Sequence, residues 1–128
     1  MNRHQFQEWS EPELVFAPDE KDAVWASDPN QRTEVYNMSV YPHAAGFIGL
    51  PTMFRLIKRI PKSDVTRGQS PNEGPIDVQL ATSDDGRTWH RTVPRVNMIP
   101  RGAPGTCDGG AILGVSSTCV HVGDKTWK

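Results

Sequence analysis

The alternation of hydrophobic and polar positions along the chain predicts short strands joined by turns. Residues 76–81 alternate apolar with polar side chains, the two-residue period of a strand with one buried face. Residues 35–41 are rich in β-branched and aromatic side chains, which favours a strand, and Pro42 should end it. A second apolar run is interrupted by Pro51 but continues as extended chain. The predicted strands are residues 35–41, 47–57, 76–81 and 89–93.

Polar segments separate the predicted strands. Residues 17–32 and 61–75 contain mainly charged residues, Pro, Asn, Ser and Gly, so they are predicted to be surface loops, as is the stretch 94–106. Residues 107–115 are then expected to form another strand, and residues 119–127 to begin the following one, with a turn at 123–124.

A tight turn is predicted between the third and fourth strands. The Asp84 carboxylate can accept hydrogen bonds from backbone N–H groups that follow it, and Gly86 can adopt a positive φ without steric cost. Thr88 can bond back to the loop, and Trp89 can bury its indole where the next strand starts. Together with Thr82, these residues should fix the turn from both sides.

Composition supports an all-β chain and excludes some partners. The 128 residues can form one small domain, and 11 glycines and 11 prolines favour strands and turns over long helices. A net charge of -1 gives no reason to expect binding to nucleic acid or to an anionic membrane. No apolar run reaches membrane-spanning length, and the first residues lack the apolar core of a secretory signal, which leaves the localisation open.

Nothing in the spacing of cysteines and histidines predicts a metal or a cofactor. Cys107 and Cys119 could form a disulfide in an exported protein or remain two free thiols. No zinc-ligand spacing surrounds them, and the four histidines are scattered at positions 4, 43, 90 and 121. We therefore expect no metal and no cofactor.

The turn sequence resembles a motif of known proteins. Thr82, Asp84, Gly86, Thr88 and Trp89 match all five defining positions of the Asp-box, (Ser/Thr)-x-Asp-x-Gly-x-Thr-Trp, which recurs in the blades of sialidase-like β-propellers. In those families the box lies on the outer edge of a blade, away from the catalytic centre. The resemblance therefore implies a structural role for these residues.

The order of motifs is similar to that of the five-bladed β-propellers in the glycoside hydrolase superfamily of arabinanases, β-xylosidases and fructan-cleaving enzymes. The segments that carry the resemblance are 9–15, 34–42, 76–89 and 105–110. It implies an all-β, partial five-bladed propeller. Residues 1–16 would end one blade, 33–93 would form a complete four-stranded blade and 105–128 would begin the next.

A degenerate internal repeat accompanies this resemblance. Trp9 would correspond to Trp89, 80 positions later, and the excess over a usual blade length can be accounted for by the long loops. A blade tail, one blade and half of another do not close a ring, so we expect a piece of a larger protein or a truncated reading frame. Its open blade edges could be covered by self-association.

If the resemblance holds, glycoside cleavage requires two carboxyl groups that flank the bond. Glu34 and Asp108 are the candidates, because they begin successive inner strands and are 74 positions apart, close to the repeat. Tyr36 would stack on or hydrogen-bond a sugar, and Arg32 would tune the site electrostatically. The alternative is that both acids only bond loop backbone. Cys107 stands where the relatives often carry Trp.

Two classes of function follow from the resemblance. The first is a glycosidase fragment that acts on a poly- or oligosaccharide, without a cofactor, although a central calcium ion occurs in some relatives. The second is a non-catalytic propeller that holds a glycan or a protein in the same funnel, because fold alone does not determine function. The isolated chain could also be an inactive remnant, since a site assembled from several blades cannot form from fewer than two.

Overall fold

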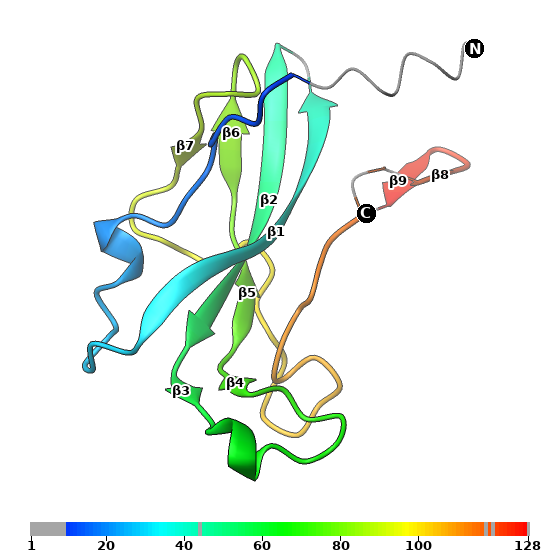
Figure 1. Cartoon of the computed structure of the whole chain (residues 1–128). Coiled ribbons are helices and arrows are strands. Elements are labelled where there is room, and N and C mark those ends of the chain that lie inside the picture. Colours follow the sequence, from blue (N-terminus) through cyan, green and yellow to red (C-terminus); the bar gives the residue numbers. More distant parts are fainter. Residues whose placement is uncertain (1–9, 44, 117, 119, 128) are drawn as a thin grey trace.

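The computed structural model describes residues 10–43, 45–116, 118 and 120–127. This part of the chain is all-β with antiparallel ladders, and its short 3-10 helices are η2 (Glu20–Asp22) and η3 (Lys62–Asp64) (Figure 1). The strands are β1 (Arg32–His43), β2 (Gly46–Leu56), β3 (Lys58–Arg59), β4 (Asn72–Glu73), β5 (Ile76–Val78), β6 (Ala81–Ser83), β7 (His90–Arg91), β8 (Val120–Val122) and β9 (Lys125–Trp127). The predicted all-β class is confirmed, and the sheets of the described part do not close into a ring.

The main sheet follows the order of the chain. Its strands lie in the order β1, β2, β6, β7. β5 also pairs with β2, at a different part of that strand from β6. The ladder between β1 and β2 is the longest and extends from Arg32 opposite Leu56 to His43 opposite Gly46. Four successive antiparallel segments, with β5 and β6 as the third, agree with the four strands predicted from the sequence.

Pro51 accounts for the division of the third strand into β5 and β6. β5 pairs with residues 52–54 of β2, whereas β6 pairs with residues 47–49. Pro51 lies between these two ladders and has no N–H to donate, but its carbonyl accepts a hydrogen bond of 3.0 Å from the N–H of Gln79. The missing donor thus divides the third strand without interrupting β2, which is continuous through Pro51.

The expectation that Pro42 ends the first strand is wrong. β1 continues to His43, and Pro42 is paired with Phe47 across the ladder. In the described part of the chain, β1 has a strand neighbour only in β2. A proline is tolerated in such an edge strand because its missing N–H can face the unpaired side.

The core lies along β2 and the third strand. Its buried apolar side chains are Leu50, Met53, Leu56, Ile76, Val78 and Ala81. Asp77 is also buried, at 1% exposure, although the alternation of residues 76–81 predicted that one face of this strand would be polar and open. Its carboxylate is paired with Arg55 and Arg101, so this strand is covered on both faces and its charge is neutralised.

The turn between β6 and β7 is closed mainly by Ser83 and Asp85. Asp85 Oδ1 accepts hydrogen bonds of 2.7 Å from the N–H groups of Arg87 and Thr88, and Ser83 Oγ accepts one of 2.9 Å from Gly86 N–H. The prediction of Asp84 as the capping carboxylate is wrong, because Asp84 is exposed and Asp85 accepts the backbone hydrogen bonds instead. Thr82 is exposed as well.

Other predictions for this turn are confirmed. Gly86 has φ 75°. The Thr88 hydroxyl donates to the Asp85 carboxylate, and the half-buried Trp89 donates from Nε1 to the Gly86 carbonyl at 3.2 Å. Hydrogen bonds from the backbone N–H of Thr88, then of Arg87, and from the hydroxyls of Ser83 and Thr88 lower the pKa of Asp85 from 3.8 to about 2.

The remaining elements are short ladders away from the main sheet. The predicted loop 61–75 contains η3 and is closed at its base by the β3–β4 ladder. The predicted turn at 123–124 is present between β8 and β9, and Gly123 has φ 62°. No helix within the described ranges is long and apolar enough to cross a membrane. Trp9 and Cys119 lie outside the described residues, and Cys107 is a free, exposed thiol.

Candidate functional site

Contacts between distant parts of the chain recur at an almost constant separation in sequence. Four ion pairs and hydrogen bonds join residues 74 or 76 positions apart, namely Arg87 with Glu13, Arg95 with Asp19, Asn37 with Leu113 and Ser39 with Val115, and the Arg91–Asp22 pair spans 69 positions. Residues 13–19 therefore contact residues 87–95, and residues 37–39 contact residues 113–115. Successive units that pack against each other through equivalent parts produce this kind of constant separation.

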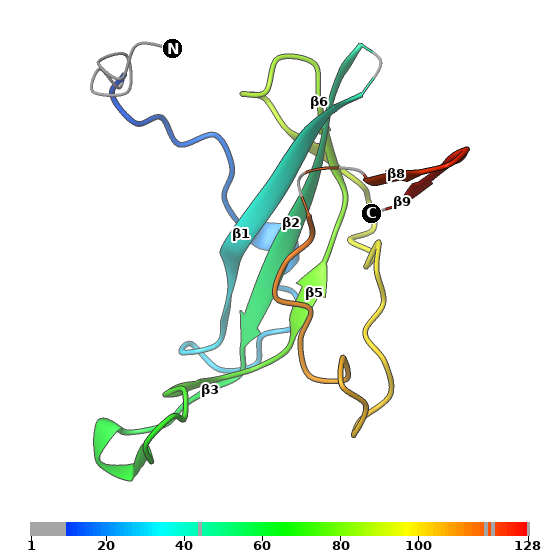
Figure 2. The ribbon, with the colours of Figure 1, turned by 90° about the vertical axis from the view of Figure 1, so that its right-hand side faces the viewer.

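The segment 111–115 crosses one face of the main sheet. It begins beside β5, where Ala111 forms a parallel bridge with Ile76 and Ile112 N–H donates to the Ile76 carbonyl at 3.1 Å. It reaches β1 where the Asn37 side-chain amide donates to the Leu113 carbonyl at 2.7 Å. The orange segment in Figure 2 follows this path across β2. This face, from β5 to β1, is the site that we describe below.

Glu34 lies on the same face, at the beginning of β1. Its partner in the ladder is Phe54, whose partner is Ile76, so the three residues form one row across the sheet. Glu34 is 43% exposed in its side chain and is paired with Arg32, whose Nη2 is 2.6 Å from Glu34 Oε1. Arg32 is thus placed where its charge can act on this carboxylate.

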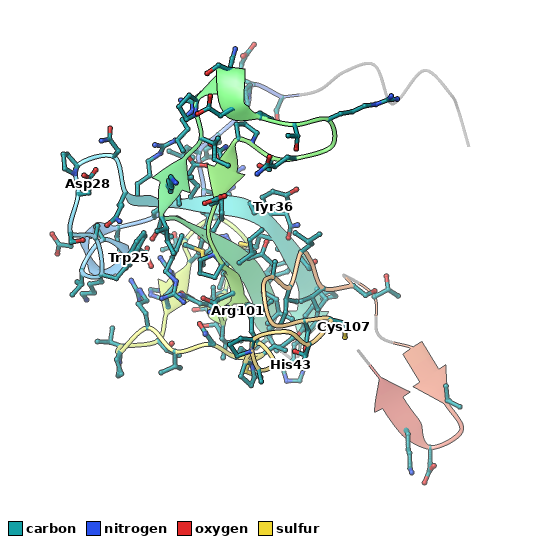
Figure 3. All side chains as sticks on the ribbon, turned by 90° about the horizontal axis from the view of Figure 1, so that it is seen from below. Trp25, Asp28, Tyr36, His43, Arg101 and Cys107 are labelled. Carbon is teal, nitrogen blue, oxygen red and sulfur yellow. The ribbon has the colours of Figure 1, made fainter. Side chains whose placement is uncertain are left out.

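Tyr36 occupies an irregularity in β1. The register shifts between Val35 and Asn37, which pair with the consecutive residues Met53 and Thr52, so Tyr36 is the extra residue of a β-bulge. The bulge keeps Glu34 and Asn37 on one face although they are three positions apart. Tyr36 is 57% exposed, and Figure 3 shows it on β1. Bulges often re-aim side chains beside functional sites.

The prediction that residues 107–115 form a strand that Asp108 begins is wrong, because Asp108 lies in a turn and the residues after it form only a single bridge at Ala111. Asp108 is exposed and accepts a hydrogen bond of 2.8 Å from the Thr106 hydroxyl. Arg101 holds this turn against the sheet, because its Nε donates to the buried carboxylate of Asp77 at 2.5 Å and its Nη1 donates to the Gly109 carbonyl at 2.9 Å. Figure 3 shows Arg101 and Cys107 on this part of the chain. Arg101 was not among the predicted site residues, and no motif around it could have identified it.

The two predicted acids belong to different segments and bond to different neighbours. The row from Glu34 through Phe54 and Ile76 ends at Ala111, three positions after Asp108. With about 4.8 Å between neighbouring strands, the backbones of Glu34 and Ala111 are on the order of 14 Å apart. Each carboxylate bonds within its own segment, Glu34 to Arg32 and Asp108 to Thr106.

The opposite face of the sheet holds a second group of acids that is fully neutralised. Asp22 is buried and accepts two hydrogen bonds of 2.6 Å from the guanidinium of Arg91, which also lies 5.3 Å from the ring centre of Phe16. Burial raises the pKa of Asp19, but the hydrogen bond and the charge of Arg95 outweigh it and hold the pKa below 3.8. These pairs attach the chain before β1 to the chain after β6.

A cavity of about 360 Å³ adjoins this neutralised group and is lined in part by Asp22 and Asp77. Trp25 Nε1 donates to Thr33 Oγ1 at 2.9 Å and that hydroxyl donates to the Asp22 carbonyl at 2.7 Å, whereas the buried Arg95 Nε in the lining has no hydrogen-bond partner in the described part of the chain. Because ion pairs hold the acids of this face, we assign a structural role to it. Within the described residues, no group of three or more His, Cys, Asp or Glu side chains could hold a metal ion.

The chain has no match among protein-family models, curated proteins or solved structures. The assignment of a function therefore rests on the geometry of the face from β5 to β1.

Proposed function

We propose that this chain forms part of a β-propeller domain of the glycoside hydrolase type, which acts on a poly- or oligosaccharide. The observation that carries the proposal is the constant separation of 74 to 76 residues between contacting segments. In a propeller, equivalent parts of neighbouring blades lie side by side, and the first strand of each blade faces the central axis. β1 and the segment 111–115 are the two first strands in this proposal.

Glu34 and Asp108 are then the pair that flanks the glycosidic bond. The contacts Asn37–Leu113 and Ser39–Val115 show that β1 and the segment 111–115 run in parallel. Both acids precede these contacts in sequence, so in this proposal they lie toward the same end of the two segments. One would protonate the leaving oxygen, and the other would activate water or attack the sugar. The exposed Tyr36 at the bulge offers a ring to a sugar between them.

The test measures release of reducing ends from a panel of polysaccharides by the whole protein in which these residues occur. Glu34→Gln and Asp108→Asn should each lower kcat by about 10² to 10⁴, the usual contribution of a general acid or base. Glu73→Gln and Asp124→Asn are matched controls, because both acids are exposed and lie outside the site. Full activity in either test variant would contradict the proposal.

A non-catalytic glycan-binding role is the second candidate. It is favoured by one observation, that the Asp108 carboxylate bonds to Thr106 in its own turn, as a purely structural acid would. Under this alternative, Tyr36→Ala weakens retention of the protein on immobilised polysaccharide, whereas Asp108→Asn leaves that retention unchanged. Neither the original protein nor any variant releases reducing ends.

A further inference from the structure

A groove of about 610 Å³ adjoins the candidate site where β1 begins and β2 ends. One wall is the turn that leads into β1, and the other is the chain from the end of β2 to η3. The Gln31 side-chain amide donates to the Ile57 carbonyl at 3.4 Å and links the two walls. Ile57 is 50% exposed, so the groove offers apolar as well as polar surface.

The lining of this groove carries an excess of positive charge. Arg32, Lys58, Arg59 and Lys62 line it, and Asp28 is the acidic residue among the lining residues. Asp28 is occupied in its own turn, where Oδ1 accepts hydrogen bonds from Asn30 N at 2.7 Å and Asn30 Nδ2 at 3.0 Å. A cleft lined by charges of one sign raises the local concentration of oppositely charged ligands.

The three basic residues after β2 are not used by the protein itself. Within the described part of the chain, no carboxylate lies within ion-pair distance of Lys58, Arg59 or Lys62. Glu73 is the ladder partner of Lys58, but their charged atoms do not form an ion pair either. These cations are therefore available to a ligand.

The groove is continuous with the candidate site through Arg32. Arg32 and Glu34 are two positions apart in β1 and point to the same face, and Arg32 also lines the groove. A sugar chain bound over Glu34 can therefore extend past Arg32 into the groove. The guanidinium groups of Arg32 and Arg59 suit the planar, two-oxygen geometry of carboxylate and sulfate groups.

We infer that the groove binds an anionic oligosaccharide, one that carries uronate carboxylates or sulfate esters, as the continuation of the chain held at Glu34. This inference rests on the proposed function and specifies its substrate class. The anionic groups pair with the cations of the groove, while the apolar faces of the sugar rings contact Ile57.

The test is calorimetric titration of the whole protein with four probes. Polygalacturonate supplies carboxylates, its methyl-esterified form supplies the same sugar without charge, and carrageenan supplies sulfates. Single-stranded RNA supplies anionic charge on a ribose–phosphate backbone that is not a polysaccharide. The double variant Lys58→Gln with Arg59→Gln removes two charges from the groove. Arg67→Gln with Lys125→Gln removes two exposed charges elsewhere and serves as the control.

We expect polygalacturonate or carrageenan to bind, and the groove variant to bind it about tenfold more weakly while the control binds normally. Tenfold corresponds to about 1.4 kcal/mol, a reasonable loss for two exposed charge contacts. Equal binding of charged and methyl-esterified polymer would overturn the inference but leave carbohydrate recognition intact. RNA binding as tight as that of the charged polysaccharides would also overturn it, and no binding to any polysaccharide would remove the proposed function as well.

Discussion

The two faces of the main sheet use acidic residues in opposite ways. Asp22 and Asp77 are each only 2% exposed in their side chains, and arginines neutralise both. Glu34, on the other face, and Asp108, in the turn before the segment 111–115, are accessible, and each bonds to a single neighbour in its own segment. The acids that anchor this sheet face are thus buried and paired with arginines, whereas an accessible acid in a single exposed ion pair contributes little to stability.

The largest effect on this comparison is expected from Asp22→Asn. The variant leaves the guanidinium of Arg91, itself only 6% exposed, without its carboxylate. Breaking a buried pair by removal of one partner should lower the free energy of unfolding by about 3–5 kcal/mol. Urea unfolding followed by tryptophan fluorescence measures this, with the exposed Asp28→Asn as control. A loss below about 1 kcal/mol would show that the pair is not a structural anchor.

A smaller effect is expected in the turn between β6 and β7. Ser83→Ala removes the acceptor for Gly86 N–H in a buried position, so the free energy of unfolding should fall by about 1–2 kcal/mol. Asp85→Asn should lower the melting temperature, whereas Asp84→Asn should not, because Asp85 accepts the backbone hydrogen bonds of Arg87 and Thr88 and Asp84 does not. The opposite ranking of the two aspartates would restore the prediction made from the motif.

Acid should weaken the same turn. The folded-state pKa of Asp85 is about 2, below its ordinary value of 3.8, so the charged form is favoured by folding. Its contribution is complete above pH 3.8 and is lost as the pH falls toward 2, which means that stability should decrease over this window. Asp85→Asn should flatten the decrease when melting temperature is measured against pH. An unchanged slope would show that other carboxylates cause it.

The smallest effect on stability is expected at the beginning of β1. Arg32→Gln breaks an ion pair whose side chains are 54% and 43% exposed, so the free energy of unfolding should change by less than about 1 kcal/mol. The same variant should weaken polysaccharide binding, since Arg32 belongs to both the candidate site and the groove. A large loss of stability without loss of binding would reverse the assignment of the two faces.

The strand order could be predicted from the sequence because it depends on local patterns. Two-residue periodicity, β-branched residues and turn residues are all read within a few positions, and they gave four successive strands and the turns at Gly86 and Gly123. The prolines were harder, because the effect of a proline depends on whether its strand has a neighbour on the N–H side. That neighbour is a long-range property, so the passage of β1 through Pro42 was missed.

The candidate site was less accessible to sequence reasoning. The choice between Asp84 and Asp85 depends on which carboxylate points back into the turn, and a motif alone does not resolve it. Asp77 and Arg101 are 24 positions apart, so their contact cannot be read from a local pattern. The strand alternation also places Asp77 at a polar, open position, whereas two arginines bury it. The basic groove likewise forms only when the beginning of β1 and the end of β2 come together in the folded sheet.

The packing of the segment 111–115 along β1 is the claim on which the account depends, and nuclear Overhauser effects test it without any mutation. The Asn37 side-chain amide donates to Leu113, and a Cβ built on Gly114 would be 3.4 Å from Asn37 Nδ2. We expect cross-peaks between the Asn37 side-chain amide protons and the Gly114 α protons. Their absence, with the Asn37 amide protons instead close to another segment, would contradict this packing and the proposal that Glu34 and Asp108 act as a catalytic pair.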